Sequence, residues 1–259
     1  MRLYRQAGVG ESCMGVREHI EDSGRWLFRW RGYLPVAVVV LSLLAMSRET
    51  AASAAGFPEL AWESACLLVS MLGLAIRVAT VGQAPVGTSG RNAREQRAVS
   101  LNTTGVYSLV RHPLYLGNFF LMLGVVAFAR SSWLTVWYCL SFWLYYERIM
   151  AAEEAFLREK FTLQFEEWSR HVPAFIPRFT GWSPSPLGFS ARNCLRREYN
   201  GFFAVFLSMF LLDVARNMAL EGRMQADHRW WVLLGAALAI WLLLRSLKRY
   251  TELLRVQGR

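Results

Sequence analysis

The sequence predicts an all-α, polytopic membrane protein with about six transmembrane helices and a cofactor site at its cytoplasmic face. Hydrophobic residues make up 54% of the chain. They gather in six apolar blocks, at 33–47, 60–79, 115–129, 133–146, 202–217 and 230–247. A helix of about 20 residues crosses a bilayer, so several blocks are short. The first, preceded by Arg29 and Arg31, also fits an interfacial segment.

Aromatic and basic residues support this fold class and predict the orientation. Tryptophans lie at block ends, as an interfacial belt requires: Trp26, Trp30, Trp62, Trp133, Trp230 and Trp231. Of 29 Lys and Arg residues, 23 lie in the two terminal tails and the segments 78–114 and 147–200. This asymmetry predicts that both termini are cytoplasmic. The net charge of +10 then reflects topology and attraction to anionic lipid, which argues against nucleic-acid binding. The arginine-rich composition suggests a bacterial inner membrane.

The order of the segments predicts four regions. These are a flexible cytoplasmic tail (1–24), two membrane helices (25–80), a core (81–180) and a two-helix extension (181–259). Within the core, a glycine-rich connection follows the second block and is either a lid or an inert linker. A short turn at 130–132 joins the third and fourth blocks into a hairpin. Residues 153–170 predict an amphipathic surface helix, with apolar Leu157, Phe161, Phe165 and Trp168.

The most informative segment is 105–117, Gly-Val-Tyr-Ser-Leu-Val-Arg-His-Pro-Leu-Tyr-Leu-Gly. Pro113 suits the first turn of a helix, and a residue before proline, here His112, is pushed out of the helical region. Arg111 and His112 are therefore expected at the mouth of a membrane helix. Free N–H groups and the positive end of the helix dipole favour an anionic group there.

Acidic residues supply a second set of candidates. Glu153 and Glu154 follow a membrane block, and carboxylates accept hydrogen bonds from a diol or an ammonium. The alternative is that they complement the dipole of a helix start. Asp213 lies three residues before Arg216, which predicts a local ion pair rather than a proton site. The cysteines, at positions 13, 66, 139 and 194, have no zinc or redox spacing, so we expect free thiols and no metal centre.

Together with Glu153-Glu154-Ala-Phe-Leu and Val172-Pro173-Ala-Phe-Ile176-Pro177, the Arg-His-Pro-Leu-Tyr-Leu-Gly element resembles the isoprenylcysteine carboxyl methyltransferase family. These are integral-membrane enzymes that use S-adenosylmethionine, and phospholipid N-methyltransferases are their relatives. The resemblance covers residues 98–178. It implies a cofactor site of nine residues: Leu101, Asn102, Tyr107, Arg111, His112, Pro113, Leu114, Tyr115 and Glu153.

The resemblance also implies two catalytic candidates. Arg148, near the end of the fourth helix, is expected to meet the acceptor's carboxyl, and Glu154 is the alternative to Glu153 shifted by one residue. One segment departs from the family: prenylated-protein methyltransferases have a His-Thr-Leu-Val-like run where this chain has Val99-Ser100-Leu101-Asn102.

The expected activity is methyl transfer from S-adenosylmethionine to a lipid-like acceptor in the bilayer, with preference for a prenylated-cysteine or isoprenoid carboxylate. Phospholipid amine N-methylation is an alternative. An NADPH-dependent sterol-type reductase is another, but its Arg-Asp-Glu and Lys-Tyr-Gly elements are replaced here by Ala152-Glu153-Glu154 and Lys160-Phe161-Thr162. A non-catalytic scaffold would have no need for the charged cluster. The sequence does not set the oligomeric state.

Overall fold

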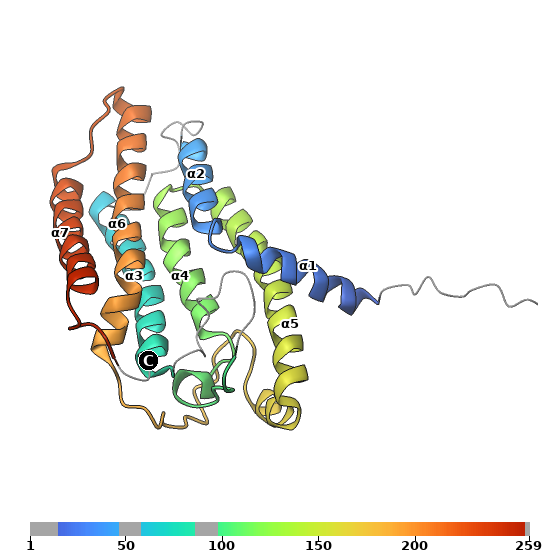
Figure 1. Cartoon of the computed structure of the whole chain (residues 1–259). Helices are drawn as coiled ribbons and strands as arrows, with labels where there is room; N and C mark the ends of the chain where they lie inside the picture. The colour runs from blue at the N-terminus through green and yellow to red at the C-terminus, as the bar shows by residue number, and fades with distance from the viewer. Residues whose placement is uncertain (1–14, 47–57, 86–97, 257–259) are drawn as a thin grey trace, which may run out of the picture.

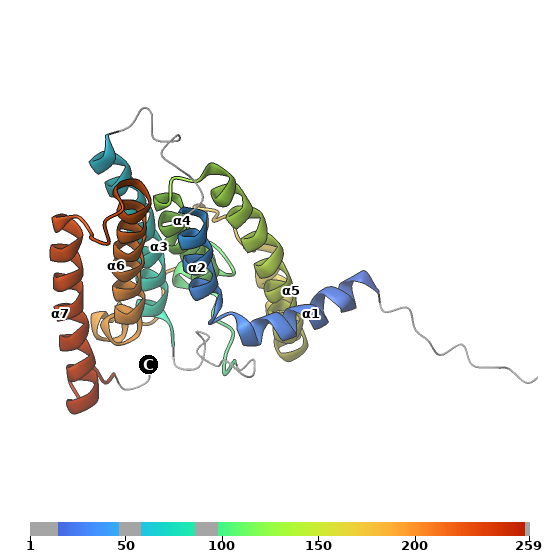
Figure 2. The same ribbon diagram turned by 90° about the horizontal axis from the view of Figure 1, so that it is seen from above.

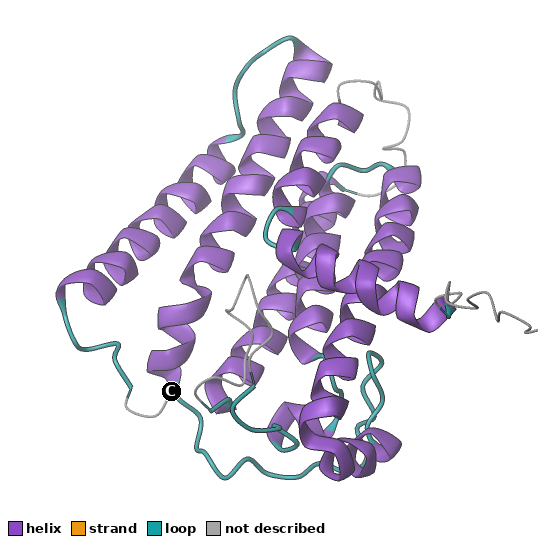
Figure 3. Ribbon diagram, turned by 45° about the vertical axis from the view of Figure 1, so that its right-hand side comes forward, coloured by secondary structure: helices purple, strands orange, loops and turns teal. Residues whose placement is uncertain are grey.

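The computed structural model describes residues 15–46, 58–85 and 98–256, and these ranges are all-helical without a strand, as predicted (Figures 1 and 3). The predicted tail up to residue 14 and most of the glycine-rich connection lie outside them. The elements are α1 (Val16–Trp30), α2 (Leu34–Met46), α3 (Glu59–Gln83), the 3₁₀ turn η1 (Gly105–Ser108), α4 (Pro113–Phe128), α5 (Ser132–His171), α6 (Ala191–Glu221) and α7 (His228–Tyr250).

Within the described ranges, three helices, α3, α6 and α7, are long and apolar enough to cross a membrane, and the bent α1–α2 pair would make four. The expected count of six is therefore not confirmed. Helix α4 is apolar but has only 16 residues. The fourth apolar block forms the first part of α5, a helix of 40 residues whose second half is charged. The predicted hairpin is present, because α4 ends at Phe128 and α5 begins at Ser132.

Helix α1 begins inside the region predicted as a tail and turns sharply into α2, at an angle of 78°. It lies across α5 rather than parallel to the other helices (Figure 2). The contact is close because Gly24 faces the carbonyl of Arg148, where a Cβ would collide. The Tyr145 hydroxyl donates to the carbonyl of Leu27 at 2.8 Å and fixes the crossing.

Helices α3 and α4 approach each other closely along small residues. Gly73 packs against the backbone of Leu121, and Ser70 donates to the Leu121 carbonyl at 2.9 Å. Next along the seam, the position that a Cβ of Gly117 would take is only 2.5 Å from Cγ of Arg77. The missing side chain therefore leaves room for Arg77 to extend along α4.

The amphipathic segment predicted at 153–170 is helical but is divided by a kink. Its first part continues α5 directly from the membrane block, because residues 147–152 include no glycine or proline. At Thr162, whose φ is 24°, the backbone is not helical, and a second helical stretch follows this kink. Phe165 on this segment is fully buried.

At the other end of the bundle, a charged cluster ties α3, α6 and α7 together. Arg216 contacts Asp213 at 2.6 Å, which confirms the predicted ion pair, and Glu63 of α3 at 3.0 Å. Trp230 does not lie in an exposed aromatic belt as expected. It is buried, and its Nε1 donates to Glu63 at 3.3 Å.

Candidate active site

The three sequence elements that carry the family resemblance meet in space. The backbone N–H of Arg111 donates to the carbonyl of Pro173 at 2.9 Å, and that of His112 donates to Ala174 at 3.1 Å. The backbone N–H of Arg178 donates to the carbonyl of Leu109 at 3.0 Å. The proline-containing segment after α5 therefore runs alongside the Arg-His-Pro element and holds it in place.

The loop before this element is fixed by η1. Gly105 has a φ of +62°, a conformation that favours glycine, and a Cβ there would overlap the side chain of Gln83. The Gly105 N–H donates to Ser183 at 2.8 Å. The carbonyl of Tyr107 accepts from Nε1 of Trp168 on α5 at 3.1 Å. These bonds place Tyr107 under the charged half of α5.

His112 is the N-cap of α4, with φ −120° and ψ 60°, and Pro113 is the first helical residue, as the sequence predicts. The imidazole is buried and lies between the two glutamates of α5. Its Nε2 is 3.0 Å from Oε1 of Glu154, and its Nδ1 is 3.7 Å from Oε2 of Glu153. His112 also stacks on Tyr115, with ring centroids 5.6 Å apart.

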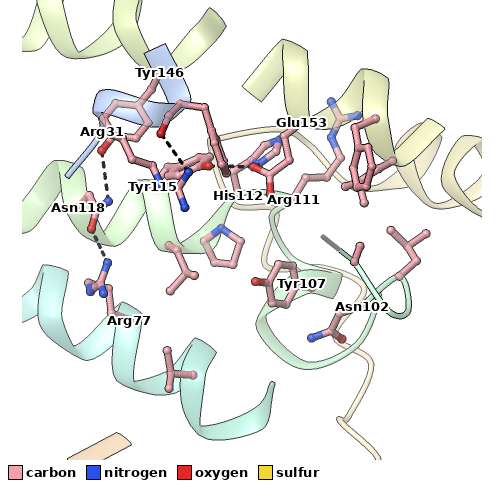
Figure 4. A pocket seen from close by; sticks show the side chains of 18 of the residues that line it. Arg31, Arg77, Asn102, Tyr107, Arg111, His112, Tyr115, Asn118, Tyr146 and Glu153 are labelled. Atoms are coloured by element: carbon pink, nitrogen blue, oxygen red, sulfur yellow. Dashed lines mark hydrogen bonds and ion pairs between the residues drawn. The ribbon is translucent and has the colours of Figure 1, made fainter. Parts of the chain in front are cut away.

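The two adjacent glutamates have different surroundings. Glu153 accepts a hydrogen bond from the Tyr115 hydroxyl at 2.9 Å and lines the pocket (Figure 4). Glu154 lies behind the lining, where it pairs with Arg111 at 3.1 Å. Burial acts to raise the pKa of Glu154, but the hydrogen bond and charge of His112 and the charge of Arg111 outweigh it and hold that pKa below its usual value. Glu154 is thus an ionised anchor for Arg111 and His112.

These groups surround a pocket of about 300 Å³. All nine residues predicted to bind the cofactor line it, from Leu101 to Glu153. Tyr107 remains protonated, because burial raises the pKa of its hydroxyl far above the usual range, and the negative charge of Glu153 adds to this against the opposing charge of Arg197. The Nε–H of Arg111 is buried and has no hydrogen-bond partner among the described residues.

The structure does not bring Arg148 into this pocket. Its guanidinium donates to the carbonyl of Leu144 at 2.7 Å, and it is not among the lining residues. Helical geometry explains this, because Arg148 lies about 200° around α5 from Tyr146, which does face the pocket.

Several lining residues were not predicted. They are Phe28, Arg31 and Gly32 near the α1–α2 bend, Arg77 and Val81 of α3, Asn118 of α4, Tyr146, Phe156, Leu157 and Trp168 of α5, Arg197 and Glu198 of α6, and Ala98 and Ser100 of the loop before η1. The sequence could have indicated Asn118 as a pocket residue, because it is a polar residue inside an apolar block. It could not have indicated Glu198, since this residue reaches the pocket only through the packing of α6 on α3.

Comparison with known proteins identifies this core. Residues 63–164 match the phospholipid methyltransferase family. The match includes α4 and most of α5, and the sequence-based resemblance to integral-membrane methyltransferases is confirmed. No solved structure matches the chain.

Curated relatives match part of the chain. The chain is 39% identical to the nickel-cobalt-cadmium resistance protein NccN of Alcaligenes xylosoxydans xylosoxydans, over 46% of this chain and 54% of that protein. It is 38% identical to the cobalt-zinc-cadmium resistance protein CzcN of Cupriavidus metallidurans, over 46% and 53%. It is 34% identical to the protein-S-isoprenylcysteine O-methyltransferase of Schizosaccharomyces pombe, over 30% and 33%. The chain thus spans about half the length, or less, of these relatives.

Proposed function

We propose that this protein is a membrane-embedded, S-adenosylmethionine-dependent methyltransferase that acts on a lipid-like acceptor. The observation that carries the proposal is the single pocket at which the Arg-His-Pro element and Glu153 meet. The match of residues 63–164 to the phospholipid methyltransferase family supports it. Both termini are proposed to be cytoplasmic, in a bacterial inner membrane, with the pocket on the cytoplasmic side.

The residues of the pocket fit the methyl donor. The buried, unpartnered Nε–H of Arg111, next to the first turn of α4, suits a carboxylate. Glu153 suits an ammonium or a ribose diol, and Asn102 and Tyr107 offer polar contacts for adenosine. A volume of about 300 Å³ is at the lower end of ligand pockets.

S-adenosylmethionine, when bound, supplies a methyl group on a positively charged sulfur. An acceptor atom forms a bond to the methyl carbon, and the sulfur leaves with the electron pair of the broken carbon–sulfur bond. The protein has to hold the acceptor in line and exclude water. Packed aromatic side chains exclude water: the ring centroids of Tyr115 and Tyr146 lie 4.9 Å apart in a tilted arrangement, and Phe142 stacks on Tyr146 with centroids 4.1 Å apart. A carboxylate acceptor needs no base, whereas an amine must lose a proton. The preferred acceptor is a prenylated-cysteine or isoprenoid carboxylate.

The names of NccN and CzcN raise metal handling as a second candidate function. The described residues include one acidic cluster with suitable spacing, Glu59, Glu63 and Asp227. Arg216 and Arg229 already contact all three carboxylates, at 2.6 to 3.9 Å. Since these arginines already pair with the three carboxylates, we favour methyl transfer.

The test is binding to the detergent-purified chain by isothermal titration calorimetry. S-adenosylhomocysteine should bind, and NADPH should not; the reverse result would point to a reductase. Turnover with N-acetyl-S-farnesylcysteine would then define the acceptor. For a carboxylate the rate should be flat between about pH 6 and 9, whereas an amine acceptor gives a rate that rises as its proton is lost. A steep rise would favour N-methylation of a lipid amine.

A further inference from the structure

The pocket has a second end, beyond Tyr115, that is built partly from outside the family-matched region. There it is lined by Arg77 of α3, Asn118 of α4 and Tyr146 of α5 (Figure 4). Arg31, which follows α1, and Glu198 of α6 complete it. These two residues lie outside the matched range 63–164. This end is therefore a feature that the shared core does not define.

Arg77 is held rigidly but still has donors to offer. Its Nε and Nη2 donate to the two carboxylate oxygens of Glu198, at 2.7 and 3.0 Å, and its Nη1 donates to Asn118. Asn118 in turn donates to the Tyr146 hydroxyl at 3.3 Å. A guanidinium has five N–H donors in a fixed plane, so two remain for a ligand. The side chain keeps 24% of its surface exposed, and it lines the pocket.

Arg31 is the second cation that lines this end of the pocket. Its guanidinium lies over the ring of Phe28, 3.5 Å from the centroid, and donates to the Phe28 carbonyl at 3.2 Å. Arg31 and Arg77 both interact electrostatically with the hydroxyl of Tyr146. Arg31 also interacts electrostatically with Tyr115. Two cations thus act on Tyr146, at the end of the pocket that adjoins Tyr115.

The chain on either side of Arg31 faces outward and is aromatic. Trp30 is 50% exposed and Tyr33 is 66% exposed. Such side chains prefer the boundary between lipid headgroups and acyl chains. Arg31 is therefore at the level where the headgroup of a lipid would lie.

The charge of the whole lining also favours an anion. Four arginines line the pocket, Arg31, Arg77, Arg111 and Arg197, against only two glutamates, Glu153 and Glu198. Glu154 behind the lining compensates one further positive charge. Among the described lining residues, arginines therefore outnumber glutamates, and the methyl donor carries no net negative charge.

We propose that Arg31 and Arg77 form the acceptor subsite and bind an anionic headgroup, a carboxylate or a phosphate, of a lipid-like molecule entering from the bilayer. This inference rests on the proposed methyltransferase function. Glu198 acts through Arg77 and is a positioning residue. Esterification of a carboxylate removes its charge, so the same two arginines hold the product less tightly than the substrate.

The experiment uses three amphiphiles with the same twelve-carbon chain: dodecanoate, dodecyl phosphate and dodecyltrimethylammonium. Their binding to the full chain in a neutral detergent is measured by thermal stabilisation, in parallel with titration of S-adenosylhomocysteine. Arg31→Gln is the test variant. Arg29→Gln is its matched control, because Arg29 belongs to the same basic segment but is exposed and does not line the pocket.

We expect the wild type and Arg29→Gln to prefer one anionic probe over the ammonium, and the better anion identifies carboxylate or phosphate. Arg31→Gln should bind that probe about tenfold more weakly, the loss typical of one charged hydrogen bond, with S-adenosylhomocysteine affinity unchanged. Equal binding in Arg31→Gln and Arg29→Gln, or no anion preference in the wild type, would overturn the proposal. If S-adenosylhomocysteine binds neither the wild type nor either variant, the methyltransferase function is rejected. The binding of the three amphiphiles tests the anion subsite independently of that result.

A second variant separates charge from geometry. Arg77→Lys keeps the positive charge but loses the planar fork that contacts Glu198 and Asn118 together. We expect the anion preference to survive and the affinity for the anionic probe to fall. Unchanged affinity would show that Arg77 has only a structural role and would remove it from the subsite.

Discussion

Replacing Glu153 or its neighbour Glu154 by glutamine gives a direct test of the site, because the two side chains differ in what they touch. Glu153 is 31% exposed and faces the pocket, with the Tyr115 hydroxyl 2.9 Å away. Glu154 is 17% exposed and contacts Arg111 and His112 instead. Both substitutions keep the size of the side chain and remove one negative charge.

The two substitutions should produce opposite patterns. A glutamine at 153 can still accept from Tyr115, but it no longer offers a charged acceptor to an ammonium or diol. A hydrogen bond to a charged group contributes about 1.5–3 kcal/mol, so S-adenosylhomocysteine should bind roughly 10- to 150-fold more weakly. A glutamine at 154 leaves the partly buried Arg111 without its counter-charge, so the main loss is stability, about 1–3 kcal/mol.

Calorimetric titration gives the affinities, and thermal unfolding in the same detergent gives the stabilities. Glu153→Gln should lose affinity with a Tm close to that of the wild type, and Glu154→Gln should show the reverse. Equal losses of affinity in both variants, or none in either, would refute the assignment of Glu153 to the pocket and of Glu154 to its support.

The pH dependence of the Glu154 variant follows from the sign of its shift. The pKa of this carboxyl is held below its ordinary value of 4.5, so the ion pair is complete above that pH and is lost as the pH falls through the folded-state pKa. The Tm advantage of the wild type over Glu154→Gln should therefore shrink as the pH falls below about 4.5. An advantage that persists undiminished to about pH 2 would contradict this.

Three further predictions concern packing and topology. Gly117→Ala should destabilise the α3–α4 seam by about 1–3 kcal/mol and displace Arg77, measured as lower Tm together with weaker binding of the anionic probe. Arg216→Met should cost about 3–5 kcal/mol because it leaves the fully buried Asp213 carboxylate without its cation, measured by denaturant unfolding in detergent. Reporter fusions after Arg130 and after Gly222 should both lie outside, and a cytoplasmic signal at either would contradict the proposed topology.

Those parts of the site that depend on local chemistry could be predicted from the sequence. Proline fixes its own φ and restricts the residue before it, so His112 and Pro113 predict the start of α4 wherever that helix lies. The same reasoning gave the short turn before Ser132 and the pairing of Asp213 with Arg216. Each of these interactions joins residues that are near in the chain.

The remaining features depend on how distant helices pack. A charged residue near the end of an apolar block, such as Arg77, is expected at the interface on topological grounds alone. Its position beside Gly117 and opposite Glu198 follows from the close approach of α3 and α4 and the contact of α3 with α6. Arg148 shows the opposite case: the resemblance implied an arginine near the end of the fourth helix, but the rotation of α5 presents Tyr146 to the pocket instead.

The division between predicted and unpredicted residues has a functional counterpart. The nine residues assigned to the methyl donor, from Leu101 to Glu153, all lie within the range that matches the phospholipid methyltransferase family. Residues assigned to the acceptor include Arg31 and Glu198, outside that range. A common donor requires a common set of contacts, whereas different acceptors require different ones. If this division holds, exchanging the α1 segment between this chain and a relative should alter the choice of headgroup and leave the affinity for S-adenosylhomocysteine unchanged; a parallel change in both would show that donor and acceptor sites are not separable.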